Sequence, residues 1–352
     1  MILFFDKIRT DLTYARPNER SYSFLNRSGL EESGLVREKL NSWFGHYPEP
    51  GHNELKKRMQ SKEHFSDAFF ELYMHEFFYD KGFQLSVHPK LVGSDKHPDY
   101  FVEKGKELNF YLEAKVVNDE SDEERIYKEK QEKIADEINK LTNFPFWISI
   151  QHLKIKNDSS FSVKPLINKI QEAVEPYDYL KMKEQSIIES LSFEDENFQL
   201  ELAIWPRVSS RIEGINPAVG VYDYFDAIFV NISEAMSKAI EVKAKKYGKQ
   251  KFPFVIALNC KSPYHFTFFD LEQLIGKDIK HTRSNKPMSE IDKELPNKSI
   301  FSNHFMDQVA ALFITWVTPY HQEDEQWYWC ENPNFNDKNF QESLIKQIFR
   351  VC

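Results

Sequence analysis

Cysteine is scarce in this chain: Cys260, Cys330 and Cys352 are the only three among 352 residues. Three widely separated cysteines exclude the disulfide framework of a small secreted protein and are typical of a reducing cytoplasm, so we expect a cytoplasmic protein. No apolar run approaches the roughly 20 residues that a membrane-spanning helix needs, and we expect no membrane partner. The opening Met1–Phe5 is too short for an export signal, and Asp6 follows it at once.

Glycine is also scarce, with 11 residues, and no glycine-rich loop is present that could cradle a phosphate, which argues against a nucleotide hydrolase. The formal net charge of −9 is mildly unfavourable for nucleic-acid binding, because lysine and arginine make the phosphate contacts. It does not exclude such binding, since a basic groove can lie on an acidic protein. Aromatic residues make up 15% of the chain, including 30 phenylalanines, and this content argues against disorder.

Hydrophobic periodicity predicts an α/β protein in which regular structure begins near residue 61. The expected elements of this first part are a helix at 66–80, strands at 83–88, 100–103 and 108–117, a helix at 121–141 and a strand at 146–155. The helix at 66–80 has apolar residues on several sides, which indicates burial on several sides, and Lys81-Gly82 ends it. Lys104-Gly105-Lys106 is expected to form the turn between the second and third strands.

The second half alternates again between helical and strand patterns. The expected elements are helices at 163–174, 233–247 and 270–275, and strands at 198–205, 224–230 and 254–258. Residues 309–317 fit a strand or a buried helix, and periodicity leaves both open. We expect three parts: a helical and loop segment at 1–60 with its best helix at 30–44, a core at 61–157, and an α/β region at 158–352. Whether this last region extends the same sheet is left open, and residues 276–299 read as a mobile loop.

The third strand carries a charged pair that needs an explanation. Strand side chains alternate between faces, so Glu113 and Lys115 point one way while Phe110, Leu112 and Ala114 point the other. A carboxylate and an ammonium on an otherwise apolar strand are costly to remove from water. The alternative is an ion pair on an edge strand that faces the solvent.

Asp99, in the only Pro-Asp of the chain, opens the preceding strand. If Lys104–Lys106 forms a three-residue loop, Glu103 pairs with Glu107, and Asp99 lies opposite Tyr111 and diagonal to Glu113 on the same face. Two carboxylates, the Ala114 carbonyl and waters would suit Mg²⁺ or Mn²⁺. Such an ion can activate water for phosphodiester cleavage, with Lys115 orienting the nucleophile. Mutual repulsion of the carboxylates should raise at least one pKa, most of all that of Glu113.

The Glu-x-Lys string is weak evidence by itself, because it recurs at Glu54–Lys56 and Glu241–Lys243. The copy at Glu241–Lys243 lies in a helical pattern, where residues two apart do not share a face, and we interpret it as a decoy. Only the copy at Glu113 lies on a convincing strand after a Pro-Asp and a short turn, and this context strengthens it.

The run from Glu71 to Lys115 resembles the PD-(D/E)xK nuclease superfamily, which includes restriction endonucleases and Holliday-junction resolvases. The resemblance implies a restriction-endonuclease-like core, in which a helix, a three-strand antiparallel meander, a helix and a strand follow one another, here with an extra α/β C-terminal part. A helical glutamate eleven residues before a helix-ending glycine joins the site in the resolvase-like branch. Glu71 stands in that position before Gly82, and the resemblance implies that Glu71 contacts the metal directly or through water.

The whole chain also resembles a bacterial protein group through several short motifs. The matching stretches are Phe24–Ser28, Ala68–Glu76, His97–Tyr100 and Lys245–Asn259. This resemblance implies a fold and a site, but no substrate.

Other polar and aromatic groups have both a functional and a structural interpretation. His75, His88 and His97 match no zinc spacing and are favoured as surface histidines or histidines behind the site, with His97 nearest to Asp99. The remaining groups are Lys128, Lys130, Gln131 and Lys133 on the charged helix, the basic cluster Lys243, Lys245, Lys246, Lys249 and Lys251, and the aromatic run Gln326–Trp329. For these the structural alternatives are a solvated helix face, an exposed helix end and buried packing.

The sequence therefore favours a metal-dependent nuclease, most readily on DNA, with Glu71, Asp99, Glu113 and Lys115 as its catalytic residues. The expected ligands of the Mg²⁺ or Mn²⁺ ion are Glu71, Asp99, Glu113 and the Ala114 carbonyl. The alternative is a non-catalytic nucleic-acid-binding or structural protein with the same fold, since a fold does not determine a function. A homodimer is left open.

Overall fold

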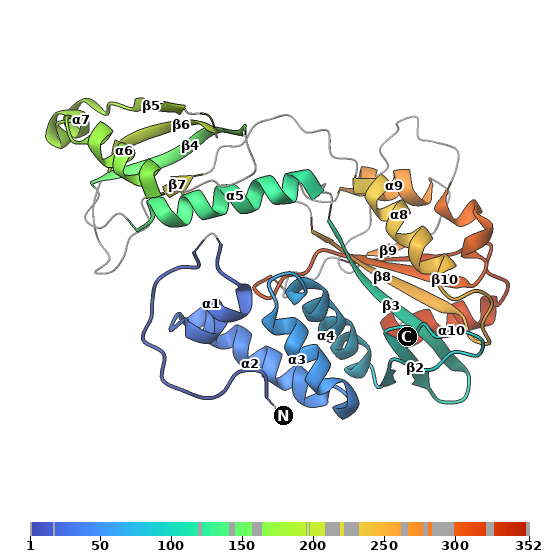
Figure 1. Cartoon of the computed structure of the whole chain (residues 1–352). Coiled ribbons are helices and arrows are strands. Elements are labelled where there is room, and N and C mark those ends of the chain that lie inside the picture. The colour runs from blue at the N-terminus through green and yellow to red at the C-terminus, as the bar shows by residue number, and fades with distance from the viewer. Residues whose placement is uncertain are drawn as a thin grey trace. The chain divides into compact units, whose positions relative to one another are not determined.

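The chain forms two compact units, which a computed structural model defines separately (Figure 1). Unit 1 consists of Met1–Arg9, Arg20–Asp119 and Val230–Cys352, and unit 2 of Thr10–Glu19 and Glu120–Phe229. The structure describes residues 2–16, 18–118, 122–140, 145–156, 164–194, 196, 198–207, 219–221, 232–261, 267–276, 281–283, 299–321 and 327–349.

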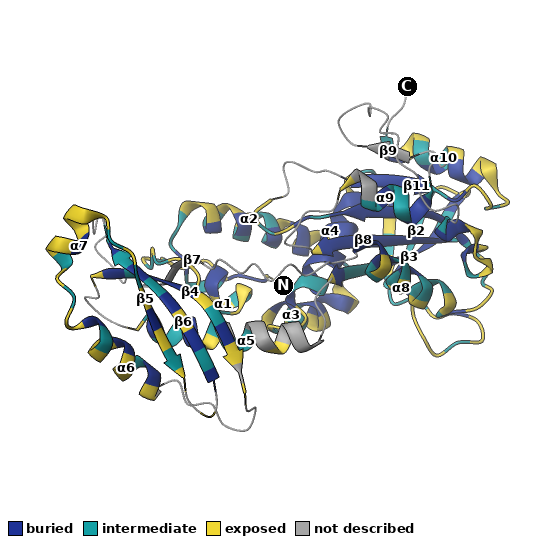
Figure 2. Cartoon of the chain, turned by 90° about the horizontal axis from the view of Figure 1, so that it is seen from above, coloured by how far each residue is buried: buried dark blue, intermediate teal, exposed yellow. Residues whose placement is uncertain are grey.

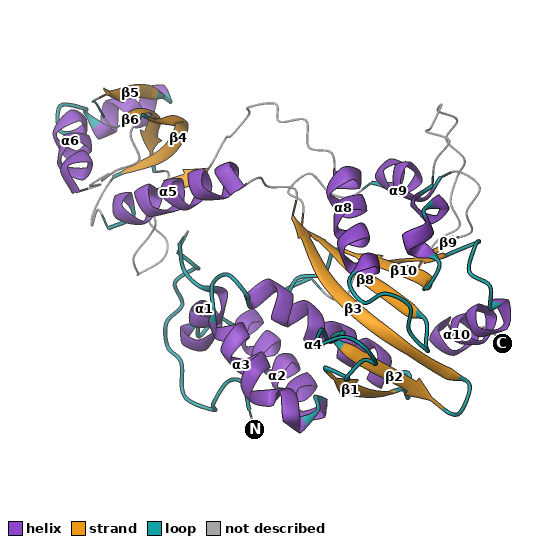
Figure 3. Cartoon of the chain, turned by 45° about the vertical axis from the view of Figure 1, so that its right-hand side comes forward, coloured by secondary structure: helices purple, strands orange, loops and turns teal. Residues whose placement is uncertain are grey.

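Unit 1 is built on a mixed sheet whose strands lie in the order β1-β2-β3-β8-β10-β11-β9. The strands are β1 (Gln84–Val87), β2 (Tyr100–Lys104), β3 (Leu108–Asn118), β8 (Phe254–Lys261), β9 (His281–Arg283), β10 (Val309–Thr315) and β11 (Trp327–Glu331). β1, β2 and β3 form an antiparallel meander, whereas β3, β8 and β10 run parallel to one another. Figure 3 shows the long β3 with β2 on one side and β8 on the other, so that β3 belongs to both the meander and the parallel set.

β8 and β10 are mostly apolar and almost entirely buried because helices cover both of their faces. Every described residue of β10 is buried, as is every residue of β8 except Lys261. In Figure 2, β8 is coloured as buried in the interior of unit 1. The continuous pattern resolves the ambiguity at residues 309–317 in favour of a strand.

The helices of unit 1 divide between the two faces of its sheet. They are α1 (Ser21–Arg27), α2 (Glu31–His46), α3 (His52–Gln60), α4 (Phe65–Tyr79), α8 (Ile232–Lys245), α9 (Phe268–Ile275) and α10 (Lys338–Phe349), with short 3₁₀ turns at Glu49–Gly51, Ile300–Ser302 and His304–Met306. One buried cluster joins α2, α3, α4 and α10 to Phe110 and Leu112 of β3. Another joins α8 and α9 to Ile256 and Leu258 of β8. Each face of the sheet therefore has its own core.

Unit 2 has a smaller sheet in the order β5-β6-β4-β7. Its elements are α5 (Asp122–Ile138), β4 (Phe146–Ile155), α6 (Lys164–Val174), α7 (Tyr179–Gln185), β5 (Glu189–Glu194), β6 (Phe198–Pro206) and β7 (Val219–Val221). Alternate residues of β4 and β6 form one core with apolar residues of α5, α6 and α7, and this core is separate from those of unit 1.

The mixed α/β class and most expected elements are confirmed, including the helix at 66–80 and the three strands of the meander. The division of the chain differs from the expected parts, because residues 61–157 are shared between both units. The expected second helix and fourth strand, α5 and β4, lie in unit 2. The parallel neighbour of β3 is instead β8, which belongs to the second half of the chain.

A few expectations have other outcomes. The segment at 276–299 was expected as a loop throughout, but it contains β9, which pairs with β11. The strand expected at 224–230 lies outside the described residues. Trp327, Tyr328 and Trp329 are buried in β11, which confirms the packing interpretation, while Gln326 is not described. Within the described residues, no helix is both long and apolar enough to cross a membrane.

The backbone at two glycines allows a direct test of the fold. Gly82, which ends α4, has a φ of +74°, a region that side-chain-bearing residues avoid. Gly45 lies exposed in α2 with open space around the position of a Cβ. Gly82→Ala should therefore lower the free energy of unfolding by roughly 1–2 kcal/mol. Gly45→Ala should raise it by roughly 0.5–1 kcal/mol. Urea titrations measure both free-energy changes. Equal effects of the two variants would contradict the left-handed backbone conformation of Gly82 at the end of α4.

Candidate functional site

The candidate site lies at the start of β2, beyond which β3 no longer pairs with β2 but keeps β8 as its neighbour on the other side. The last pair between the two strands is Tyr100 with Leu112, and β3 runs on to Asn118. Beyond that pair, acidic side chains replace β2 as hydrogen-bond acceptors. The Ala114 N–H donates to Asp99 Oδ2 at 2.7 Å. An N–H and a C=O of the same strand residue point to the same side. The Ala114 carbonyl therefore faces this edge as well.

The observed register places Asp99 directly opposite Glu113, one position beyond the pair of Tyr100 with Leu112. The expected position, opposite Tyr111 and diagonal to Glu113, is wrong. The reason is that Lys104 still pairs with Leu108, so that the three-residue loop consists of residues 105–107. This shift moves the register by two residues and leaves the face unchanged. Asp99 and Glu113 consequently share a face, as the alternation of side chains predicts.

Glu113 is fully buried, and its carboxylate is held by the C-terminal end of α8. Its Oε2 accepts a hydrogen bond from the Lys243 ammonium, and its Oε1 accepts one from the Tyr247 hydroxyl. The Lys246 Nζ lies 3.5 Å from Oε1. Lys243 also faces Asp99, with its Nζ 3.8 Å from Asp99 Oδ2. Two carboxylates from neighbouring strands thus meet one ammonium from a helix.

The electrostatics of this group follow from its burial. Burial raises the pKa of Glu113, and Asp99 adds to the rise, while Lys243 and Tyr247 oppose it. This direction agrees with the expectation from the sequence. Burial lowers the pKa of Lys243, but Asp99 and Glu113 outweigh this effect, and its pKa lies above the usual value. Lys243 is therefore a charged partner of both carboxylates near neutral pH.

Glu71 lies on α4 and forms a bidentate ion pair with Arg58 of α3. The Arg58 Nη1 and Nη2 donate to the two carboxylate oxygens of Glu71 at 2.7 and 2.5 Å. The Tyr100 hydroxyl donates to the Glu71 carbonyl at 3.0 Å, which fixes α4 against the start of β2. Burial raises the pKa of Glu71 to about 7, with Asp99 adding to the rise and Arg58 opposing it.

Lys115 shares the face of Glu113 by alternation, but its ammonium lies 3.8 Å from Asp67 Oδ1 at the start of α4. The Lys115 side chain is 43% exposed. The same Asp67 oxygen accepts a hydrogen bond from the Val116 N–H at 3.4 Å, so α4 borders β3 past the end of β2. The lysine near the two carboxylates is therefore Lys243, not Lys115.

The residues that sequence reasoning missed come from elements distant in the chain. Lys243 belongs to the Glu241–Lys243 string, which we interpreted as a decoy; its helical setting is confirmed, but it reaches the site through α8. The charged helix that carries Lys128, Lys130, Gln131 and Lys133 is α5. That helix lies in unit 2, and its residues Lys128 and Gln131 have no described side chains. Arg58 gave no sequence signal, whereas Tyr247 lies amid the basic cluster that begins at Lys243.

The histidines have structural roles. His88 pairs with Glu54, its Nε2 lying 3.1 Å from the carboxylate, and the exposed His97 contributes its carbonyl as an acceptor for the Tyr247 hydroxyl. His75 is buried on α4, so of the two expected positions, at the surface or behind the site, the surface one is excluded for it. Burial, with a smaller contribution from His46, lowers the pKa of His75 to about 4.

A divalent ion fits the donor atoms of this edge in part. Across the described residues, no group of three or more His, Cys, Asp or Glu side chains is arranged to hold a metal. Glu71 is unsuited as a direct ligand, because both of its oxygens hold Arg58. Asp99, Glu113 and the Ala114 carbonyl remain as hard oxygen donors, and Lys243 shows that a cation is favourable between the two carboxylates. A metal held there would need water for its other ligands.

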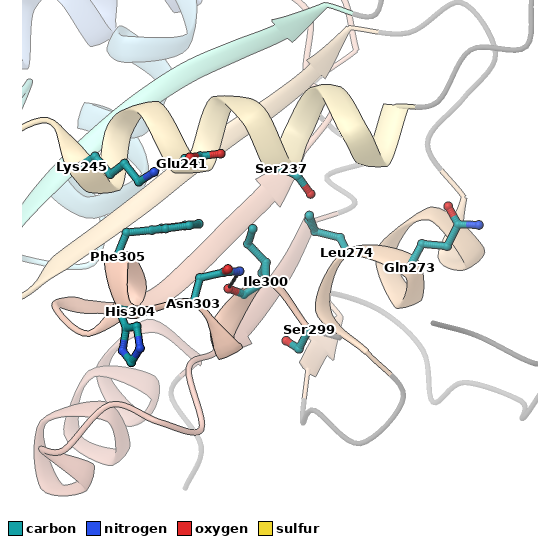
Figure 4. Close-up of a pocket in the computed structure, with 10 residues that line it drawn as sticks. All are labelled: Ser237, Glu241, Lys245, Gln273, Leu274, Ser299, Ile300, Asn303, His304 and Phe305. Atoms are coloured by element: carbon teal, nitrogen blue, oxygen red, sulfur yellow. Dashed lines mark hydrogen bonds and ion pairs between the residues drawn. The ribbon is translucent and has the colours of Figure 1, made fainter. Parts of the chain in front are cut away.

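A pocket of about 620 Å³ lies on another side of α8 (Figure 4). Ser237, Glu241 and Lys245 point from α8 toward the segment that carries Asn303 and Phe305. Glu241 and Lys245, which line the pocket, are each two residues from Lys243. Two residues correspond to a rotation of about 200° around the helix axis. α8 therefore separates this pocket from the carboxylate cluster.

The residues around Asp99 and Glu113 themselves indicate what this cluster can do chemically. Comparisons with protein families, curated proteins and solved structures give no match to this chain. The arrangement offers two carboxylates on one cation and a strand carbonyl at an open edge, with lysines on either side. It can hold a small cation, and it can attract an anion to that edge.

The raised pKa of Glu71 predicts a pH-dependent stability. The protonated form is favoured in the folded state, so its contribution is present below pH 4.5 and is lost as the pH rises through about 7. The free energy of unfolding of the wild type, relative to that of Glu71→Gln, should fall by up to about 3 kcal/mol across this window. Urea unfolding at pH 4.5, 6 and 8 measures the difference.

Glu54→Gln provides a matched control, because Glu54 also contacts Arg58, at 3.8 Å, but is 55% exposed. Titrating groups that contact neither Glu71 nor Glu54 are common to all three proteins and cancel in the comparison. A difference between wild type and Glu71→Gln that stays constant with pH, or grows in favour of the wild type, would contradict the raised pKa.

Proposed function

We propose that this protein is a metal-dependent phosphodiesterase, a nuclease of the PD-(D/E)xK type that acts most readily on DNA. The observation that carries the proposal is the meeting of Asp99 and Glu113 at one cation position beside the Ala114 carbonyl. Burying a carboxylate completely on an apolar strand is unfavourable unless a partner or a function compensates. Clusters of this kind, with raised pKa values, are typical of functional sites.

The order of the surrounding elements supports the same proposal. α4 precedes the antiparallel meander of β1, β2 and β3, and α8 then leads into β8, which runs parallel to β3. This is the order of helix, meander, helix and strand that the resemblance implies. The second helix and the last strand come from the second half of the chain, after the segment that forms unit 2.

Each residue has a chemical role in the proposed reaction. Asp99, Glu113 and the Ala114 carbonyl would hold Mg²⁺ or Mn²⁺, with Glu71 at most contacting the ion through water. The bound ion would acidify a water molecule and stabilise charge on the scissile phosphate. Lys115 stands on the same strand, partly exposed, where its charge can orient the attacking water and the phosphate.

Lysines near the site provide a path for the phosphate backbone. Lys246 lies beside Glu113, and it directly follows Lys245, the last residue of α8, whose ammonium pairs with Glu241 on another side of the helix. Their ammonium groups lie over the rings of Tyr247 and Phe305, which holds them in place at the protein surface. These positions support nucleic acid as the substrate despite the acidic net charge.

A second function is favoured by one observation. The carboxylates already have cationic protein partners, since Glu71 pairs with Arg58 and both Asp99 and Glu113 pair with Lys243. A cluster balanced in this way can be a purely structural network. The second candidate is thus a non-catalytic nucleic-acid-binding protein that retains the nuclease-like fold.

Cleavage assays with single substitutions separate the two candidates. With Mg²⁺ or Mn²⁺, the wild type should cleave at least one of linear, nicked, branched or single-stranded DNA, or RNA. Lys115→Ala should reduce the rate by about 10²–10³-fold while leaving metal binding nearly intact, because its charge acts on water and phosphate. Asp99→Asn and Glu113→Gln should lose both cleavage and metal binding.

Glu31→Gln, an exposed carboxylate on α2, is the control for changes of charge far from the edge of β3. Equal cleavage by wild type and Asp99→Asn would place the activity elsewhere or in a contaminant. No cleavage of any substrate by the wild type, together with binding that weakens as salt rises, would favour the non-catalytic candidate.

A further inference from the structure

The ammonium of Lys243 lies where a divalent ion would have to bind. It contacts Glu113 Oε2, and its Nζ is 3.8 Å from Asp99 Oδ2. A divalent ion shared by these carboxylates would have oxygen ligands at about 2.0–2.6 Å. An ammonium and a metal ion cannot both occupy this position, because they need the same oxygens and repel each other at short range.

Two further contacts near the end of α8 help to hold Lys243 at this position beside Glu113. Tyr247 and Lys246 follow Lys243 by four and three residues, and both face the second oxygen of Glu113. Spacings of three and four residues bring side chains to one side of a helix end. Each oxygen of Glu113 therefore has at least one protein partner, and the partner of Oε2 is the ammonium that stands nearest to Asp99.

The Lys243 side chain can also leave this position toward the solvent. The Lys243 side chain is 15% exposed, whereas Glu113 is completely buried. A lysine has four rotatable carbon–carbon bonds in its stem, and its ammonium can reach solvent when its partner is lost. The carboxylate cannot move in the same way, because it projects from the interior of the sheet.

We propose that Lys243 is a built-in competitor of the divalent ion: its ammonium closes the site in the metal-free protein, and metal entry displaces it from Glu113. This inference rests on the proposed function, because it concerns the same metal position. It adds a regulatory consequence, namely that the affinity of the site for metal is set by α8 and not by the ligands alone. Metal binding is then coupled to the release of the end of α8.

Manganese binding in the absence of nucleic acid tests this competition directly. Electron paramagnetic resonance of free Mn²⁺, or calorimetry, should give a dissociation constant at least about tenfold lower for Lys243→Gln than for the wild type. The amide of glutamine can still donate a hydrogen bond to Glu113, which preserves the fold, but it lacks the competing charge. Lys243→Met, which removes the donor as well, should tighten binding at least as much.

Lys245→Gln is the matched control, because it removes the same charge from the same helix. Its ammonium pairs with Glu241 and borders the pocket, not Glu113. Its Mn²⁺ affinity should stay within about threefold of the wild type. A general effect of charge near the site would instead strengthen binding equally in Lys245→Gln and Lys243→Gln.

Thermal unfolding supplies a second readout that is independent of folding yield. Without metal, Lys243→Gln should melt at a lower temperature than the wild type, because Glu113 stays buried without its charged partner. Saturating Mn²⁺ should raise the melting temperature more in Lys243→Gln than in the wild type, since ligand stabilisation grows with affinity.

The outcomes separate this inference from the proposed function. Equal or weaker Mn²⁺ binding by Lys243→Gln, with binding lost in Asp99→Asn, would overturn the competition and leave the metal site standing. Tighter binding by Lys243→Gln without any cleavage would support the competition and overturn the nuclease. Absence of Mn²⁺ binding in the wild type and in both Lys243 variants would overturn the competition and the metal site together.

Discussion

The fully buried carboxylate of Glu113 is the constraint on which the site depends. A carboxylate in the middle of a covered sheet is unfavourable unless a charged or hydrogen-bonding partner reaches it. The structure meets this requirement with Lys243 of α8 and with Tyr247, two residues beyond the end of α8, both more than one hundred residues later in the chain. The packing of α8 against β3 and β8 is therefore both hydrophobic and ionic, with Met236 and Ile240 buried on the same helix.

The position of unit 2 in the chain follows from the topology of the sheet. Parallel neighbours such as β3 and β8 need a crossover connection of a dozen residues or more. In this chain the crossover contains α8, and it also contains most of unit 2, which has its own sheet and core. Such an insertion leaves the pairing of β3 with β8 intact, because the crossover only has to return the chain to the edge of β3. Unit 2 is thus compatible with the site without being part of its sheet.

Local sequence patterns predicted only the part of the site that lies on the hairpin of β2 and β3. The alternation of residues in β3 places Glu113 opposite in direction to Phe110 and Leu112, and the turn glycine places Asp99 on the same face. The register was wrong by two residues, since a loop of three can begin at Lys104 or at Gly105 without changing which face Asp99 occupies. The positive φ of Gly105 is used in the loop that forms. A register error of two residues leaves each side chain on the same face of the sheet, but it changes which residue lies opposite on the neighbouring strand.

The amino-acid sequence by itself determined the α/β class, most helices and strands, and the common face of Asp99 and Glu113. These features depend on periodicity, turn residues and alternation, which act over a few residues. Only the tertiary structure decided which helix reaches Glu113, which strand pairs with β3, and that Lys115 turns to Asp67. These choices depend on the folding of distant segments onto one sheet. Two Glu-x-Lys strings that look alike in the sequence therefore contribute to the same cluster: the first provides the carboxylate of Glu113, and the second, far along the chain, provides the ammonium of Lys243.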